Sequence, residues 1–168
     1  MKSLHIITGP GDDNITLHVA PNSDGPGATT SYGNAIPLNF RTGEGFDSLT
    51  LNDLAADTSA DLGKGEDTFT LRSTDRDLPA GSTLTVNVDT GPGSDTIVVE
   101  SVGADTTVII DSNTSPGDNV EVDGSGIDAS STVTIDVSKD DRVKVKGSQD
   151  QDPAPAKFQV PASGVLEL

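Results

Sequence analysis

Apolar and polar residues alternate along most of this chain, in short runs separated by turns rich in glycine, proline and aspartate. A period of two is the pattern of a β-strand that buries one face. The runs come in pairs around a Gly-Asp turn, so the predicted unit is strand, Gly-Asp turn, strand and return turn. The inward positions before the turns are Leu4/Ile6, Ile36/Leu38/Phe40, Leu84/Val86/Val88, Val108/Ile110 and Val133/Ile135/Val137, and those after the turns are Ile15/Leu17, Leu49/Leu51, Phe69/Leu71, Ile97/Val99, Val120/Val122 and Val143/Val145.

The Gly-Asp turn recurs six times, four times as Gly-x-Gly-x-Asp and twice in an eroded form. The complete copies are 9–13, 43–47, 63–67 and 91–95, and the eroded ones are 116–118 and 139–141. The terminal aspartates are separated by 34, 20, 28, 23 and 23 residues. Repeats of this length are typical of solenoids, so each unit is predicted to form one coil.

These patterns predict an all-β solenoid of about six coils in residues 1–147. Residues 20–35, rich in Gly, Pro, Ser and Asn, are predicted to be a loop inserted into one coil, and residues 148–168 a C-terminal cap or tail. The segment 51–62 carries Asp and Thr throughout, and it is predicted to be a turn or one helical turn at most.

Stacking of equivalent positions separates the solenoid from its main alternative. In a parallel solenoid, Ile97 should stack with Val120 and Val143, while Val86, Val108 and Val133 form a second ladder. The alternative is an Ig-like β-sandwich, in which the Gly-Asp turns would be hairpins and Val88 would lie opposite Ile97.

Charge narrows the range of partners. The formal net charge is −17, and the acidic residues are 22 Asp against only 5 Glu. Asp is preferred where a short carboxylate caps a turn or reaches a cation beside the backbone. Nothing resembles a basic patch for nucleic acid, no apolar stretch predicts membrane insertion, and the absence of cysteine excludes disulfides and thiolate metal sites.

The complete turns, GPGDDNITL, GEGFDSLTL, GKGEDTFTL and GPGSDTIVV, resemble the calcium-binding nonapeptide of the RTX (repeats-in-toxin, haemolysin-type) family, G-G-x-G-x-D followed by an apolar alternation. One such turn occurs per unit instead of tandem nonapeptides, which favours a right-handed parallel β-helix with RTX-like turns over the β-roll itself. The resemblance implies Ca²⁺ between the turns of successive coils, held by carboxylate and carbonyl oxygens. The implied ligands are the carboxylates of Asp13, Asp47, Asp67, Asp95, Asp118 and Asp141 and the carbonyls of Gly9, Gly11, Gly43, Gly45, Gly63, Gly65, Gly91 and Gly93.

The predicted function is a calcium-stabilised solenoid module of a secreted or cell-surface repeat protein, with a structural or adhesive role. Its expected partners are calcium and a protein or polysaccharide at a cell surface. The chain has no apolar run of signal-peptide length at its start, so we expect a fragment of a longer protein or the signal-independent export that the RTX resemblance implies. No catalytic motif is present, and the chain is predicted not to be an enzyme. The alternatives are ordinary Gly-Asp turns without metal in an Ig-like adhesin, and a carbohydrate-active β-helix enzyme.

Overall fold

The computed structural model describes residues 3–18, 36–74, 83–112, 116–138, 140–146, 157–159 and 165–167, the last two ranges for their backbone alone. These residues form fourteen strands and one short 3₁₀ helix. The elements are β1 (Leu4–Ile7), β2 (Asn14–His18), β3 (Leu38–Glu44), β4 (Ser48–Asn52), β5 (Thr58–Lys64), β6 (Thr68–Leu71), β7 (Leu84–Asp89), β8 (Thr96–Val99), β9 (Thr106–Asp111), β10 (Asn119–Asp123), η1 (Gly124–Gly126), β11 (Thr132–Asp136), β12 (Arg142–Lys146), β13 (Lys157–Gln159) and β14 (Val165–Glu167).

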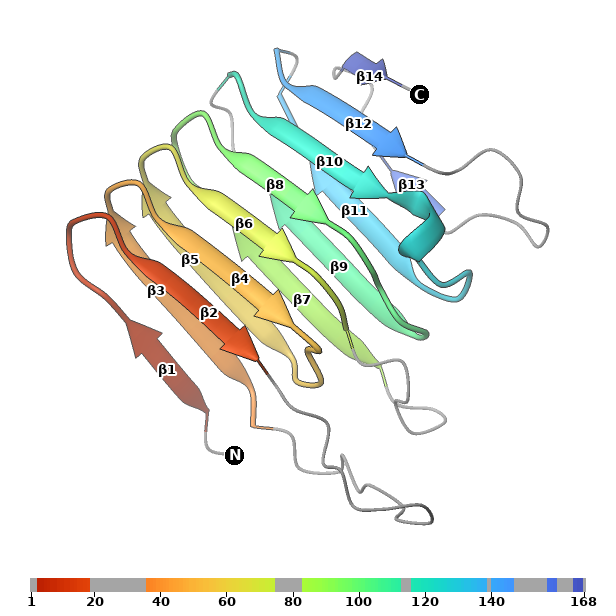
Figure 1. Ribbon diagram of the computed structural model, residues 1–168, viewed down its shortest axis with the longest axis horizontal. Helices are drawn as coiled ribbons and strands as arrows, with labels where there is room; N and C mark the ends of the chain where they lie inside the picture. The colour runs from red at the N-terminus through yellow and green to blue at the C-terminus, as the bar shows by residue number, and fades with distance from the viewer. Residues whose placement is uncertain are drawn as a thin grey trace.

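Successive strands alternate between two parallel sheets of seven strands each (Figure 1). The odd-numbered strands form one sheet and the even-numbered strands the other, each in the order of the chain. A Gly-Asp turn joins each of the first six odd strands to the next even strand, and these six turns lie along one edge of the sheets, which we call the Gly-Asp edge. The described residues that lead from an even strand to the next odd strand lie at the opposite edge, which we call the return edge. The prediction of an all-β fold with parallel strands is confirmed.

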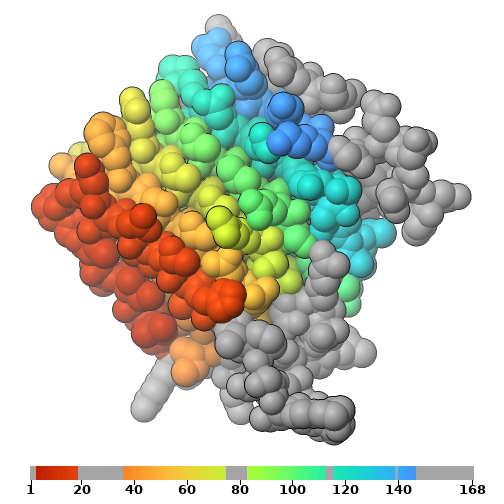
Figure 2. Space-filling model, viewed as in Figure 1, coloured from red at the N-terminus to blue at the C-terminus, as the bar shows by residue number. Residues whose placement is uncertain are grey.

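The register of the strands places equivalent residues of successive units directly beside one another. Val120 pairs with both Ile97 and Val143, as predicted. Val108 pairs with Val86 and Val133, which confirms the second predicted ladder. Figure 2 shows the units as successive bands of colour across the molecule.

The core lies between the two sheets and consists mainly of stacked Val, Ile and Leu side chains. Burial alternates along the strands, as in β8, where Ile97 and Val99 are fully buried and Thr96 is exposed. Ile6, Ile15 and Leu17 of the first unit are only partly buried, because β1 and β2 have a neighbouring strand on one side alone within the described residues. Each unit therefore completes its core against the units beside it.

Two expectations are wrong. Every strand pairing among the described residues is parallel, and Val88 lies beside Ala60 and Ile110 instead of Ile97, so the Ig-like sandwich does not apply. The segment 51–62, predicted to be a turn or one helical turn at most, contains the end of β4 and the first part of β5. Thr58 and Ala60 occupy inward positions of β5, and these small residues hid the alternation from a search for large apolar side chains.

Two other predicted segments are described partly or not at all. The loop predicted at 20–35 lies outside the described residues. The predicted cap or tail at 148–168 contributes β13 and β14, which pair with β11 and β12 and add one strand to each sheet. The prediction of about six coils thus compares with seven strands in each sheet.

Candidate metal site

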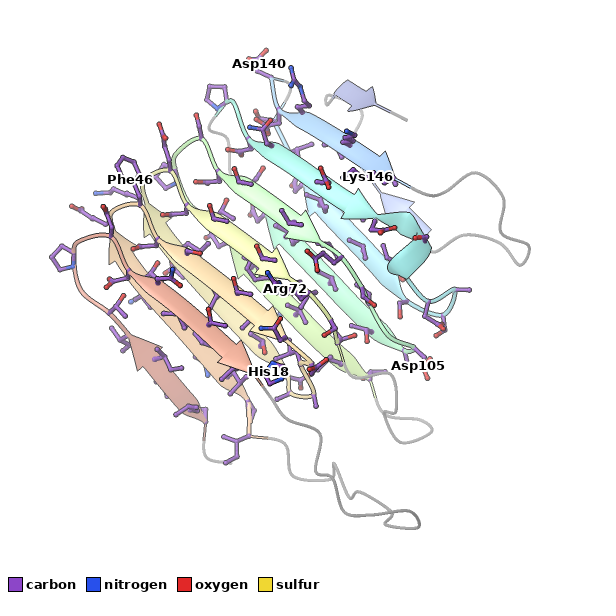
Figure 3. The ribbon with its side chains drawn as sticks, in the orientation of Figure 1. His18, Phe46, Arg72, Asp105, Asp140 and Lys146 are labelled. Atoms are coloured by element: carbon purple, nitrogen blue, oxygen red, sulfur yellow. The ribbon has the colours of Figure 1, made fainter. Side chains whose placement is uncertain are left out.

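The six aspartates that end the Gly-Asp turns form a single row along the Gly-Asp edge. Asp13 is half-buried, whereas the later ones are 0–1% exposed. Residues beside them in the turns point outward: Phe46, next to Asp47, is 60% exposed at this edge (Figure 3). The turn therefore directs one short carboxylate per unit into the space between the sheets.

One oxygen of each carboxylate after Asp13 accepts a hydrogen bond from the backbone of the preceding unit. Oδ1 of Asp67 accepts a hydrogen bond from the amide of Asp47 at 2.8 Å, and Oδ1 of Asp95 accepts from the amide of Asp67 at 2.8 Å. The same bond joins every other neighbouring pair in the row at 2.7–3.0 Å. Asp suits this position because its short side chain can reach a backbone amide one strand spacing away.

The second oxygen of most of these carboxylates has no hydrogen-bond donor. Within the described part of the chain, the buried Oδ2 atoms of Asp13, Asp47, Asp67, Asp95 and Asp118 lack any partner. Asp141 differs, because its Oδ1 accepts from the amides of Gly117 and Asp118 and its Oδ2 accepts from the amide of Ser138. The row thus has five free carboxylate oxygens and ends in an aspartate that is fully engaged.

The glycines of the turns let successive backbones approach closely. A methyl group on Gly63, whose φ is +92°, would lie 1.7 Å from the carbonyl oxygen of Gly43, and one on Gly65 would lie 1.5 Å from that of Gly45. No side chain fits in so small a space. The carbonyls of Gly9, Gly11, Gly43, Gly45, Gly63 and Gly65 all face a glycine of the next unit in this way. The following turn is the eroded one, and there the methyl position of Gly117 meets the side chain of Ser94 instead.

Burial makes the ionised form of these carboxylates costly. Burial is the main cause that raises the pKa of Asp67 to about 6; the hydrogen bond from the Asp47 amide opposes the shift, and the charges of Asp95 and Asp47 contribute to it. Burial likewise raises the pKa of Asp118 to about 6, with the neighbouring Asp141 and Asp95 adding to the effect. The pKa of Asp95 is raised for the same reason. A cation or a proton in the row would relieve this repulsion.

The residues fit the oxygen ligands that calcium requires. The methyl position of Gly65, 1.5 Å from the Gly45 carbonyl oxygen, lies 3.4 Å from Oδ1 of Asp67. Likewise, a methyl group placed on Gly93 would lie 1.5 Å from the Gly65 carbonyl oxygen and 3.0 Å from Oδ1 of Asp95. Carbonyl and carboxylate oxygens of neighbouring units therefore converge, and free Oδ2 atoms lie in the same row. No group of three or more acidic or histidine side chains gathers among the described residues, so a cation would need backbone carbonyls or water to complete its ligands.

Sequence reasoning missed a set of hydroxyl residues at the inward position that immediately precedes the turns. We call Thr8, Thr42, Thr90 and Ser112 the turn hydroxyls; the latter three are fully buried and Thr8 partly so. The signal was present, since each continues the inward alternation of its strand by one more position, as Thr42 does after Leu38 and Phe40.

Comparisons with known proteins do not identify a family for this chain. None of the described helical residues makes a helix long and apolar enough to span a membrane. Searches of protein-family models, curated proteins and solved structures find no match for this chain.

Proposed function

We propose that this chain is a calcium-binding β-solenoid module with a structural or adhesive role in a secreted or cell-surface protein. In this proposal, each odd strand, Gly-Asp turn, even strand and return turn form one coil of a right-handed parallel β-helix with RTX-like turns. The observation that carries the proposal is the row of five buried carboxylate oxygens without a partner. A buried charge without a partner is strongly unfavourable, and a bound cation would remove that cost.

Calcium would be held by the free Oδ2 atoms of Asp13, Asp47, Asp67, Asp95 and Asp118 together with glycine carbonyls of the turns. When bound, it supplies positive charge that cross-links neighbouring units. Asp141 is expected to close the row, because amides already occupy both of its oxygens. Extracellular modules bind calcium in the range of about 10⁻⁴–10⁻³ M, which matches a module that folds fully outside the cell.

The repeat architecture and the net charge also suggest which partners other than calcium the chain binds. A rigid repeat scaffold with a net charge of −17 suits a spacer or an adhesive surface for a protein or polysaccharide, and it disfavours nucleic acid and anionic membranes. We assign it no catalytic step.

Calorimetric titration of the chelator-treated protein with Ca²⁺, and with Mg²⁺ in parallel, tests the proposal. Calcium should bind at several sites per chain and raise the melting temperature by mass action. Mg²⁺ should bind more weakly, because it tolerates irregular ligand geometry poorly. The proposal is wrong if calcium produces no binding heat and the chelated and calcium-loaded proteins melt at the same temperature.

A metal-free solenoid with a partly protonated carboxylate row is the second candidate. The raised pKa values of Asp67 and Asp118 favour it, since protonation would also remove the buried charge. In that case acid, and not calcium, would stabilise the protein at concentrations of calcium found outside cells.

A further inference from the structure

Three of the four turn hydroxyls hydrogen-bond to a backbone carbonyl of the next unit. Thr8 donates to the carbonyl of Thr42 at 2.8 Å, and Thr42 donates to that of Leu62 at 2.5 Å. Ser112 donates to the carbonyl of Asp136 at 3.0 Å. These hydroxyls therefore link neighbouring units and are engaged by the backbone.

Thr90 departs from this pattern although its backbone does not. Its amide donates to the carbonyl of Asp111 at 3.1 Å, as expected for residues of adjacent units in register. Its side chain is fully buried, but its hydroxyl has no hydrogen-bond partner among the described residues. A buried hydroxyl without a partner is unfavourable and therefore points to a missing ligand.

The same turn contains a second buried oxygen without a described partner, Oδ2 of Asp95. Asp95 is 0% exposed, and its Oδ2 also lacks a partner within the described ranges. The Thr90 hydroxyl is close enough to lower the pKa of the Asp95 carboxyl against the effect of burial, yet the two groups do not meet in hydrogen-bond geometry. The turn thus holds two buried oxygens without a hydrogen-bond partner in the described chain, each with lone pairs available.

Within the described residues, no other unit of the row combines an unpartnered Oδ2 with an unpartnered hydroxyl. Leu62 occupies the position that precedes the turn of Asp67, so that unit has no hydroxyl there. Thr42 and Ser112, which precede the turns of Asp47 and Asp118, donate to carbonyls. The Ser112 hydroxyl also lowers the pKa of the Asp118 carboxyl, but unlike that of Thr90 it has a carbonyl acceptor. The Asp95 turn is therefore chemically distinct within an otherwise repetitive row.

We infer that Thr90 supplies an additional oxygen ligand beside Asp95 and makes this turn the tightest calcium site of the row. The inference rests on the proposed calcium function and specifies which site fills first. A neutral hydroxyl adds a hard oxygen without adding negative charge, so it completes the coordination of Ca²⁺ without increasing the repulsion along the row.

The test is a calcium titration of the full chain after chelation, comparing wild type, Thr90→Val, Thr90→Ser and Thr42→Val. Valine has nearly the shape of threonine, so Thr90→Val removes the hydroxyl and little else. Thr42→Val is the matched control, because it removes a buried turn hydroxyl that donates to a carbonyl. Calorimetry should show the tightest step weakened on the order of tenfold or more in Thr90→Val. That step should remain in Thr90→Ser and Thr42→Val.

The outcomes separate this inference from the proposed function. Wild type that binds no calcium overturns both. If wild type binds calcium and Thr90→Val titrates identically, the inference alone is overturned. This holds even if Thr90→Val melts at a lower temperature without calcium, because the hydroxyl would then stabilise only the calcium-free protein. An equal loss in Thr42→Val also overturns it. Circular dichroism checks that each variant is folded, and Thr90→Ala, in which overpacking is not a concern, replaces Thr90→Val if that variant fails to fold.

Discussion

The two edges of the sheets are both polar, but they satisfy their polar groups in different ways. At the return edge, Ser131 accepts from the amide of Thr106 at 3.0 Å and donates to the carbonyl of Gly103. Ser73 likewise accepts from the amide of Asp53 and donates to its carboxylate. The buried side-chain atoms without a partner in the described residues all lie at the Gly-Asp edge, on five aspartates of the row and on Thr90.

The difference follows from donor and acceptor counts. A hydroxyl both donates and accepts, so a Ser of one unit can bond both an amide and an oxygen of the neighbouring unit. An ionised carboxylate only accepts, and the row supplies it with one amide donor per unit. Among the described residues, the buried polar side chains of the return edge therefore find their partners within the protein, whereas those of the Gly-Asp edge need a cation or a proton.

The largest effect is expected from the glycine stack that brings the units of the Gly-Asp edge together. Gly63→Ala would place a methyl group 1.7 Å from the Gly43 carbonyl oxygen at a φ of +92°. Both the clash and the backbone strain act against folding, so we expect a loss of more than about 4 kcal/mol in the free energy of unfolding, or failure to fold. Denaturant unfolding in the presence of calcium measures it.

Gly9→Ala is the matched control for this substitution. It lies at the equivalent position of the first unit, and a methyl group there meets nothing within 4 Å. Its stability should be close to wild type. If Gly63→Ala were as stable as Gly9→Ala, close stacking would not be the reason for these glycines.

Removing one negative charge from the row should stabilise the protein without calcium and destabilise it with calcium. Asp67→Asn keeps an oxygen for the Asp47 amide and replaces the free Oδ2 with an uncharged NH₂ group, which can donate to free oxygens of neighbouring aspartates. With chelator present, the melting temperature should rise. With calcium present, the variant should lose about 2–3 kcal/mol relative to wild type, because a ligand is lost.

The return edge provides the control for the charge effect. Asp53→Asn removes a carboxylate charge from a residue whose side chain accepts from Ser73 and faces His18 at 3.5 Å. Calcium binding should be unchanged in this variant. Equal effects of Asp53→Asn and Asp67→Asn on calcium binding would mean that calcium senses only the bulk charge.

The sequence allowed most of the fold to be predicted because the same residues recur at the same structural positions. The alternation of Ile97/Val99, Val120/Val122 and Val143/Val145 predicted both the strands and their stacking. β5 was missed because its inward residues include Thr58 and Ala60, whose side chains are small enough to stack without being recognisable as core. Their burial depends on β3 and β7 on either side, which a local window does not contain.

The sequence predicted that the turn aspartates form a row, but it did not predict which of their oxygens are hydrogen-bonded. The repeated Asp at the end of each turn placed Asp47, Asp67 and Asp95 in one row. Which oxygen remains free depends on bonds between residues 20–34 positions apart, and that information is not local. The full engagement of Asp141 and the unpartnered hydroxyl of Thr90 likewise depend on side-chain orientation, which the repeat alone does not specify.

Acid should stabilise the Gly-Asp edge when calcium is absent. The pKa values of Asp67 and Asp118 are raised to about 6 in the folded protein, above the unfolded value of 3.8, so protonation favours folding. The associated stability is fully present below the unfolded value and is lost as the pH rises through about 6. Lowering the pH from neutral to about 5 in chelator should therefore add roughly 1 kcal/mol for each carboxylate.

The dependence should reverse in calcium, because protons then compete with the ion for the same oxygens. Thermal melts at several pH values, with and without calcium, distinguish the two cases. A chelated protein that loses stability steadily between neutral pH and about 5 would contradict the raised pKa values.

The smallest effect is expected at the return edge, where Ser131→Ala removes a hydroxyl that joins two units. The amide of Thr106 and the carbonyl of Gly103 would each lose a buried partner, since Ser131 is 2% exposed. A loss of about 1 kcal/mol is expected when relaxation or water restores part of the bonding. Because no buried carboxylate oxygen in the described part of this edge lacks a partner, the loss should be the same in chelator and in calcium, and the calcium affinity should not change. Denaturant unfolding under both conditions measures it, and a loss that appeared only in calcium would show that the two edges are coupled and not independent.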